Sequence, residues 1–321
     1  MILSMKPPYE ITPLILKLIS SISEKIGEVN ATYLNKQTPQ LRKQNQIKTI
    51  HASLQIEGNT LSEEQITALI ENKRVIGPQK DVLEVLNAIK VYQKLDSYKF
   101  ASEKSFLKAH FELMNGLIEN AGKYRKRGVG IVNGSVVEHV APSHENVPYL
   151  MNDLFDYLKD SDELTLIKSC VFHYEMEFIH PFIDGNGRMG RLWQTLILME
   201  EYPIFDFLPF ETLISNTQTL YYKSLALSDK TGKSTVFIEY MLGVIEKSLE
   251  NLLNYTNRIL KDTDRIEHFL SLGKKEFGRK DYMNVFKNIS SATASRDLKK
   301  GIDLRLLESI GDKNKTRYMI C

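Results

Sequence analysis

The stretch HPFIDGNGRMGR, from His180 to Arg191, decides the expected fold and site. Gly185 and Gly187 flank an asparagine directly before a predicted helix. Backbone N–H groups in such a loop can converge on an anion at the positive N-terminus of the helix. Arg188 and Arg191 are three positions apart and therefore share one helix face, from which both guanidinium groups reach the same anion. The stretch thus predicts an anion-binding loop that opens a helix.

Two further side chains of this stretch add reactive chemistry. Asp184 offers a hard oxygen ligand of the kind that Mg²⁺ takes when it also binds phosphate oxygens. His180 is a titratable base that can accept a proton from an attacking hydroxyl. Together with the anion nest and the arginines, these groups indicate phosphoryl or nucleotidyl transfer, in which positioning and charge neutralisation dominate.

The rest of the chain has mostly helical periodicity, which predicts a mainly α fold. Helices are expected at about 10–28, 39–57, 81–98, 104–118, 164–178, 192–199, 213–228 and 235–260, with others beginning near 62 and 147. Ser62 and Gln65 form the capping box that predicts the start near 62. The one strong β signal, Gly128–Val140, centres on Asn133-Gly134, a dipeptide typical of a two-residue hairpin turn.

Length and composition limit the class of protein. The 321 residues suit about two domains, and 42% hydrophobic with 26% charged residues excludes collagen, mucin-like and wholly disordered chains. No apolar run reaches the roughly 18 residues that span a bilayer, and no signal peptide precedes the first helix, so no membrane association is expected. With only Cys170 and Cys321, a disulfide framework is not expected and a reducing cytoplasm is.

The last 60 residues have a different character from the body of the chain. Twelve basic residues face six acidic ones from Lys274 onward, although the whole chain carries only +2. Short helices at about 262–271, 279–287 and 291–300 lead to extended runs at 304–310 and 316–320, the layout of a winged helix-turn-helix. We therefore expect an N-terminal helical region at 1–100, a core at 101–255 and a winged-helix domain at 256–321.

This domain has two interpretations that the sequence leaves open. If it binds DNA, the helix 291–300 is the recognition helix and 313–317 the wing. The basic side chains then expected at phosphates are Arg296, Lys299, Lys300, Lys315 and Arg317. Winged helices also dock proteins or pack dimers, and a fold alone does not decide function.

The motif resembles the signature of the Fic (Fido) family, HPFx(D/E)GNGRxxR, at every defined position, and the resemblance covers roughly residues 40 to 255. It implies a helical Fic core with a β-hairpin flap over the site. It also implies a protein adenylyltransferase, which uses ATP and Mg²⁺ to place AMP on a Ser, Thr or Tyr hydroxyl of a target protein. The flap of such proteins holds the target segment by strand addition.

Residue roles follow from the resemblance. It makes His180 the general base, Phe182 a core anchor, Asp184 the Mg²⁺ ligand and Arg191 the γ-phosphate ligand. The other residues that it places at the nucleotide are Gly185, Asn186, Gly187, Arg188, the flap residues Val129, Gly130, Ile131 and Val132, and the pair Tyr221 and Tyr222. Asp229 stands where relatives often have an asparagine, which leaves the preference for ATP over other donors open.

A second motif, SLQIEGN at 53–59, is similar to the family's inhibitory pattern (S/T)xxxE(G/N). A glutamate in the last turn of a helix is poorly placed against the negative end of that helix. The resemblance pairs Glu57 with Arg191, which would keep ATP in an unproductive pose, with Ser53 as part of the same inhibitory motif. It thereby places the chain among intramolecularly inhibited Fic proteins.

Several alternatives remain at this point. The transferred group could be another nucleotide, phosphate or phosphocholine, or the reaction could remove AMP. The chain could instead be a DNA-binding regulator whose Fic core senses nucleotide. The expected partners are an unknown target protein, the chain itself through self-modification, DNA through the winged helix, and a second copy, since relatives often form homodimers.

Overall fold

The computed structural model describes residues 7–32, 39–133, 136–257, 262–274, 276–286, 289–311 and 316–320. The chain divides into two compact units, Met1–Leu253 and Asn254–Cys321. Within the described ranges, no helix combines the length and apolarity that crossing a membrane requires.

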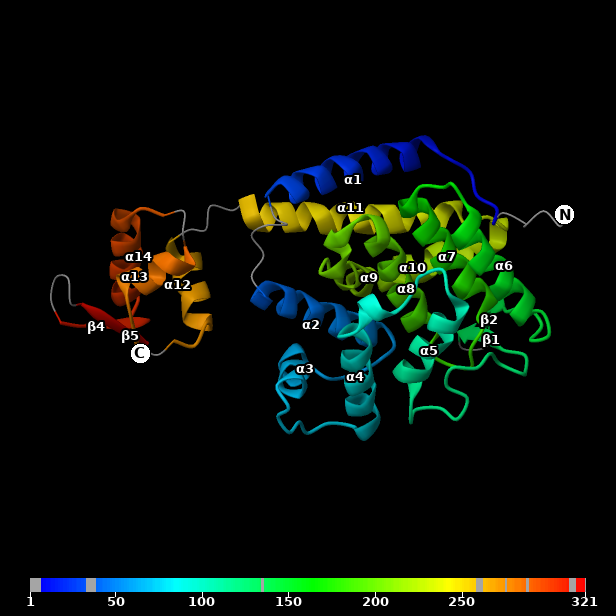
Figure 1. The fold of residues 1–321 in the computed structure, drawn as a ribbon, viewed down its shortest axis with the longest axis horizontal. Helices are drawn as coiled ribbons and strands as arrows, with labels where there is room; N and C mark the ends of the chain where they lie inside the picture. Colours follow the sequence, from blue (N-terminus) through cyan, green and yellow to red (C-terminus); the bar gives the residue numbers. More distant parts are fainter. Residues whose placement is uncertain are drawn as a thin grey trace. The chain divides into compact units, whose positions relative to one another are not determined.

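The first unit is built from helices (Figure 1), which confirms the mainly α prediction. At its centre α7 (Thr165–Ile179) and α8 (Asn186–Glu201) pack together and bury residues on all sides, as core helices do. The other helices of the unit are α1 (Pro13–Thr32), α2 (Pro39–Ile56), α3 (Glu63–Ile70), α4 (Gln79–Tyr92), α5 (Glu103–Met114), α6 (Val147–Asp160), α9 (Glu211–Asn216), α10 (Gln218–Thr231) and α11 (Thr235–Asn257), with 3₁₀ turns η1 (Leu95–Ser97) and η2 (Pro203–Asp206).

The N-terminal helix is fastened along α11, beside which Figure 1 shows it. Ser21 Oγ donates to Glu246 Oε1 (2.5 Å), and Lys25 Nζ donates to the same oxygen (3.2 Å). Thr12 Oγ1 makes the equivalent bond to Glu239 Oε1 (2.6 Å). These bonds join residues that lie near opposite ends of the unit in the sequence.

The turn after α2 sets the position of Glu57. The helix ends at Ile56, one residue earlier than predicted, because Gly58 adopts φ 88° and reverses the chain. The N–H of Asn59 then donates to Leu54 O (3.1 Å), which closes the turn. Glu57 therefore lies in the turn directly after the helix rather than in its last turn.

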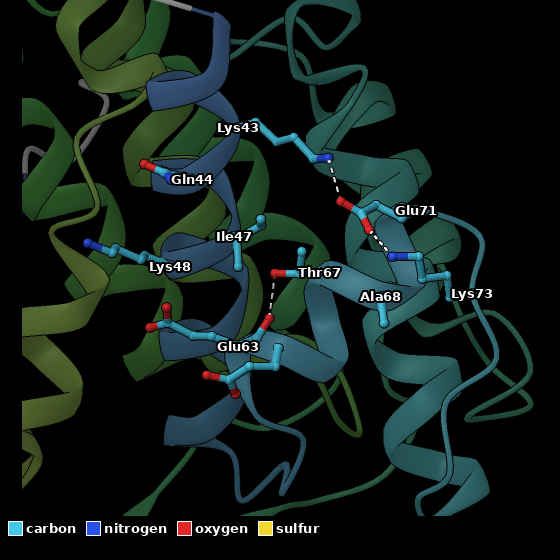
Figure 2. A pocket seen from close by; sticks show the side chains of 10 residues that line it. Lys43, Gln44, Ile47, Lys48, Glu63, Thr67, Ala68, Glu71 and Lys73 are labelled. Carbon is cyan, nitrogen blue, oxygen red and sulfur yellow. Dashed lines mark hydrogen bonds and ion pairs between the residues drawn. The ribbon is translucent and has the colours of Figure 1, made fainter. Parts of the chain in front are cut away.

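The helix after this turn begins as predicted. Ser62 Oγ accepts from the N–H of Gln65 (3.3 Å), and Gln65 Oε1 accepts from the N–H of Ser62 (2.9 Å), which completes the capping box of α3. A groove of about 830 Å³ lies between α2 and α3 (Figure 2), with Lys43, Glu71 and Lys73 forming ion pairs at its rim. None of the residues of the 180–191 motif lines it.

The β-hairpin forms where predicted, but Asn133 belongs to its first strand. β1 (Gly130–Asn133) pairs antiparallel with β2 (Val136–Val140), and Asn133 pairs with Val136. An irregularity between Ile131 and Val132 shifts the register, as a β-bulge does. Because Asn133 pairs with Val136, it is the last residue of β1 and not the first turn residue, so the prediction of an Asn133-Gly134 turn is wrong. Positions 134 and 135 connect the strands and lie outside the described residues.

The second unit contains α12 (Asp262–Ser271), β3 (Glu276–Gly278), α13 (Arg279–Val285), α14 (Ser291–Asp303), β4 (Leu307–Ile310) and β5 (Arg317–Ile320). Its sheet has the strand order β3-β5-β4, so a short strand before α13 joins the C-terminal hairpin. That strand was not expected from the sequence. Asp297 is buried and accepts two hydrogen bonds from Arg265 (2.6 and 2.8 Å), which ties α14 to α12 beside the aromatic core.

Candidate active site

The motif loop joins the two central helices through two residues in left-handed conformations. His180 caps α7 with φ 49° and ψ 60°, and Gly185 precedes α8 with φ 88°. A Cβ on Gly185 would lie 2.8 Å from Met114 Sδ, so the position requires glycine for space as well as for backbone angle. The loop consequently holds His180 at the end of one helix and points the N-terminus of α8 toward the same region.

Asn186 acts within the loop. Its Oδ1 accepts from the N–H of Phe182 (2.9 Å) and its Nδ2 donates to Phe182 O (3.0 Å), while the residue is only 3% exposed. The side chain is therefore used as a brace for the loop, and only the backbone N–H of Asn186 is placed at the helix N-terminus. Phe182 is fully buried, as its predicted anchoring role requires.

His110 supports this loop from α5, and no local signal in the sequence pointed to it. Its ring stacks on Phe182 with a centroid distance of 3.5 Å and an interplanar angle of 4°. Nδ1 accepts from the N–H of Gly122 (2.8 Å), so Nε2 carries the proton and donates to Asp184 O (3.0 Å). Burial lowers the pKa of His110 to about 4, so it stays neutral and keeps this tautomer.

The first arginine of the motif lies between two acids. Arg188 Nη2 donates to Asp184 Oδ1 (2.7 Å), and Nη1 donates to Glu84 Oε1 (3.2 Å). Glu84 comes from α4, and its other oxygen accepts from Nδ2 of Asn59 (2.9 Å) in the turn after α2. Glu84, which the sequence analysis missed, thus joins the 180–191 motif to the 53–59 motif.

The second arginine is held by residues of the 53–59 motif. Arg191 is fully buried; its Nη2 donates to Glu57 Oε1 (2.8 Å) and to Ser53 O (2.9 Å), and its Nε donates to Ser53 Oγ (3.1 Å). Burial opposes the charge, but the Glu57 carboxylate outweighs it and raises the pKa of Arg191 above its ordinary value. A Cβ on Gly187 would overlap Glu57 Oε1, so Glu57 also lies against the first turn of α8.

The two neighbouring tyrosines, Tyr221 and Tyr222, differ in their exposure to solvent. Tyr221 is buried: its hydroxyl lies 3.0 Å from His173 Nε2 and donates at 3.4 Å to Glu177 Oε1. Burial lowers the pKa of His173 to about 3, so this ring is a neutral hydrogen-bonding group of the core and not half of an ion pair. Tyr222 is 45% exposed and is the member of the pair that a ligand in solution can reach.

The hairpin is attached to the motif loop by Arg125, another residue that the sequence analysis did not select. The Nε of Arg125 donates to His180 O (2.8 Å), and its Nη groups reach backbone carbonyls at both ends of the hairpin. Val129 is partly buried and Gly130 exposed at the start of β1, whereas the side chains of Ile131 and Val132 lie outside the described part of the chain.

The comparisons with known proteins agree on one family. The sequence model of the Fic/DOC family matches residues 100–198. The crystal structure of a Fic family protein from Desulfovibrio desulfuricans is similar to this chain with a TM-score of 0.77 and 40% identity, over 99% of this chain and 98% of that one. A structure of Fic-1 from Caenorhabditis elegans shares the fold, with a TM-score of 0.62 at 22% identity over 76% of this chain and 73% of that one.

Curated relatives include the protein adenylyltransferase fic-1 of Caenorhabditis elegans, 26% identical over 74% of this chain and 49% of the relative. Another is the protein adenylyltransferase Fic of Nematostella vectensis, 32% identical over 47% of this chain and 36% of the relative. The chain spans about half the length, or less, of these curated relatives.

Proposed function

The chain belongs to the Fic family, and on this basis we propose that it is a protein adenylyltransferase that moves AMP from ATP to a Ser, Thr or Tyr hydroxyl of a target protein and of itself. The observation that carries the proposal is the motif loop. It brings a base, His180, and a carboxylate, Asp184, to the N-terminus of α8, whose first two turns carry two buried arginines.

These residues can support each step of the reaction. His180 accepts the proton of the target hydroxyl, whose oxygen attacks the α-phosphorus. The new oxygen–phosphorus bond forms as the bond from the α-phosphorus to the pyrophosphate oxygen breaks, and pyrophosphate leaves with the electron pair. The N-terminus of α8 and Arg188 stabilise the charge on the phosphates, and Arg191 would orient the γ-phosphate once Glu57 has left it.

Mg²⁺ fits this donor set. The described residues form no group of three or more His, Cys, Asp and Glu side chains that could hold a metal by themselves. Mg²⁺, however, commonly binds through one or two carboxylates and the phosphates of its nucleotide. Asp184, with its carboxylate 42% exposed, is the residue that would hold it, and the ion would neutralise phosphate charge.

Inhibition by Glu57 is part of the proposal. The Glu57–Arg191 ion pair is present at 2.8 Å, and Nε and Nη2 of Arg191 are already bonded to Ser53 and Glu57, which leaves Nη1 as the guanidinium nitrogen open to a phosphate. Removing the carboxylate should therefore raise AMP transfer, most visibly as self-modification.

The test uses ATP labelled on the α-phosphate, with Mg²⁺, and compares wild type, Glu57→Gly and Glu57→Gly/His180→Ala. We expect strong labelling of Glu57→Gly, weak labelling of wild type and none of the double variant. Label in the double variant would remove His180 as the base. No label in any variant that still binds ATP would favour another donor, and parallel reactions with other labelled nucleotides and phosphocholine separate these cases.

DNA binding by the second unit is a second candidate function, proposed together with a winged-helix assignment for that unit. The supporting observation is that α14 exposes Arg296 and Lys299 on one face. Two of the other expected phosphate contacts are engaged within the unit, since Lys300 pairs with Asp262 (2.8 Å) and Arg317 with Glu276 (2.9 Å). Lys315 lies outside the described residues.

A duplex-binding titration of the full chain at several salt concentrations tests this candidate. Affinity should fall as salt rises, and the Arg296→Ala/Lys299→Ala variant should bind more weakly while retaining AMP transfer. Equal, salt-independent binding by both proteins would favour the protein-docking or homodimer interpretation instead.

A further inference from the structure

Arg125 is a buried cation whose bonds all end on backbone carbonyls. It lies in the segment between α5 and β1 and is 3% exposed. Its Nε donates to His180 O (2.8 Å), and Nη2 donates to Ile179 O (3.3 Å) and Pro142 O (2.5 Å). Nη1 donates to Arg127 O (2.9 Å). Burial lowers the pKa of Arg125 from its ordinary value, yet a guanidinium keeps its charge in proteins.

These carbonyls belong to three separate segments. Ile179 and His180 form the end of α7, where carbonyl groups lack partners within the helix and carry the negative end of its dipole. Arg127 stands just before β1, and Pro142 just after β2. The main-chain N–H of Arg125 also donates to Pro181 O (2.9 Å). The side chain of Arg125 thus bonds the end of α7, where the motif loop begins, to the segments just before and just after the hairpin.

The backbone of His180 needs such support. A non-glycine residue in the left-handed region persists only where its surroundings hold it there. The N–H of His180 donates to Met176 O (3.0 Å), and its carbonyl accepts from Arg125, so the main chain is fixed on both sides of the imidazole. Replacing Arg125 removes one of these two hydrogen bonds. It also breaks the link between the hairpin and the motif loop.

We propose that Arg125 is a positioning residue of the transfer reaction, which fixes the base His180 and the target-binding hairpin relative to each other. The proposal rests on the proposed function, in which His180 deprotonates a hydroxyl that the hairpin presents. It assigns Arg125 no contact with nucleotide, because the hydrogen bonds of its guanidinium all go to backbone carbonyls.

The proposal predicts that replacing Arg125 lowers the turnover rate but leaves nucleotide binding nearly unchanged. Misplacing reacting groups by about 1 Å costs on the order of a hundredfold in rate. In a Glu57→Gly parent we therefore expect Arg125→Met to lower kcat for self-modification about a hundredfold and to leave KM for ATP within about twofold. Arg125→Lys keeps a charge but not the forked geometry, so its kcat should fall less.

The experiment measures kcat and KM with α-labelled ATP and follows hydrogen exchange of the same proteins. Exchange should quicken in the hairpin and in the 179–185 loop while the amides of α2 stay protected. Lys126→Met is the matched control, because Lys126 is an exposed cation next in the chain, and it should change nothing. If Arg125→Met does not fold, Arg125→Lys alone decides.

The outcomes separate the two hypotheses. An inert Glu57→Gly parent overturns the proposed function and this assignment with it. An active parent whose folded Arg125 variants keep its kcat overturns the positioning role alone. A parallel loss of ATP affinity, or faster exchange throughout the first unit, also overturns it, because either result would mean a general loss of structure.

Discussion

Removing the Glu57 carboxylate should lower the thermal stability of the nucleotide-free protein. It should also increase the stabilisation that the protein gains from bound ATP. Arg191 is fully buried, and Glu57 is its carboxylate partner at 2.8 Å. Without that partner the guanidinium is a buried charge whose remaining hydrogen bonds, among the described residues, go to Ser53. A bound triphosphate can then supply the missing anion, whereas in wild type it must first displace Glu57.

The expected loss of stability follows from the burial and the hydrogen bonds of this ion pair. Breaking a fully buried ion pair costs about 3–5 kcal/mol. The side chain of Glu57 is 26% exposed and Ser53 keeps two hydrogen bonds to Arg191, so we expect about 2–3 kcal/mol instead. For a folding unit of this size, 1 kcal/mol shifts Tm by about 2–4 °C, which gives a decrease of about 4–12 °C.

Thermal unfolding with and without Mg·ATP measures both effects. Glu57→Ala is the preferred variant, because a glycine would add backbone entropy to the unfolded chain. Glu24→Gln, an exposed acid on α1, is the control and should behave as wild type. Saturating ATP should raise Tm more in Glu57→Ala than in wild type, since stabilisation grows with affinity. An unchanged Tm without ATP, together with equal stabilisation by ATP, would refute the reasoning.

Three other predictions concern neighbouring residues. Ser53→Ala removes one bond to Arg191 and should raise self-modification to a level between wild type and Glu57→Gly, measured as incorporated label. Glu84→Gln weakens a buried ion pair with Arg188 and should lower Tm by about 2–8 °C. Burial raises the pKa of Glu211 to about 7, so the folded chain holds a proton there between pH 4.5 and 7 that the unfolded chain releases. Glu211 therefore lowers stability as pH rises through that window. Urea unfolding should show Glu211→Gln gaining stability relative to wild type from pH 5 to 8.

Local signals predicted much of the fold. The capping box at Ser62 and the helical periodicity of α7 depend on residues within a few positions of each other, and both appear in the structure. The boundaries were less accurate. Glu57 falls outside α2 because the αL conformation of Gly58 ends the helix, and Asn133 is a strand residue because it pairs with Val136. The first difference arises from backbone geometry at one position, and the second from the register of the two strands.

The supporting residues of the site could not be found in this way. Glu84 is 104 positions before Arg188, and His110 is 74 before Asp184, so no spacing rule connects them. Arg125 stands in the run KYRKR, in which its neighbours Lys126 and Arg127 are exposed. Such a run usually forms a solvated face. Only the tertiary structure distinguishes the one buried cation from the exposed ones.

In the proposed nucleotide site both arginines are already paired with acids. Arg188 is paired with Glu84 and Asp184, and Arg191 with Glu57. The two acids from the N-terminal region differ in burial, since the side chain of Glu84 is 7% exposed and that of Glu57 is 26% exposed. Separating Glu84 from Arg188 would leave unpaired charges in the interior. The carboxylate of Glu57, in contrast, can be hydrated when it leaves Arg191.

Activation should therefore exchange Glu57 for a phosphate and leave Glu84 in place. The exchange needs little rearrangement, because Glu57 lies in the turn beyond α2 and is followed by Gly58, which tolerates backbone angles closed to other residues. Gly58→Ala would restrict that turn in the left-handed region and disturb the inhibitory pose itself. We expect it to raise self-modification although it leaves every side chain of the site intact, and unchanged labelling would argue that α2 moves as a whole instead.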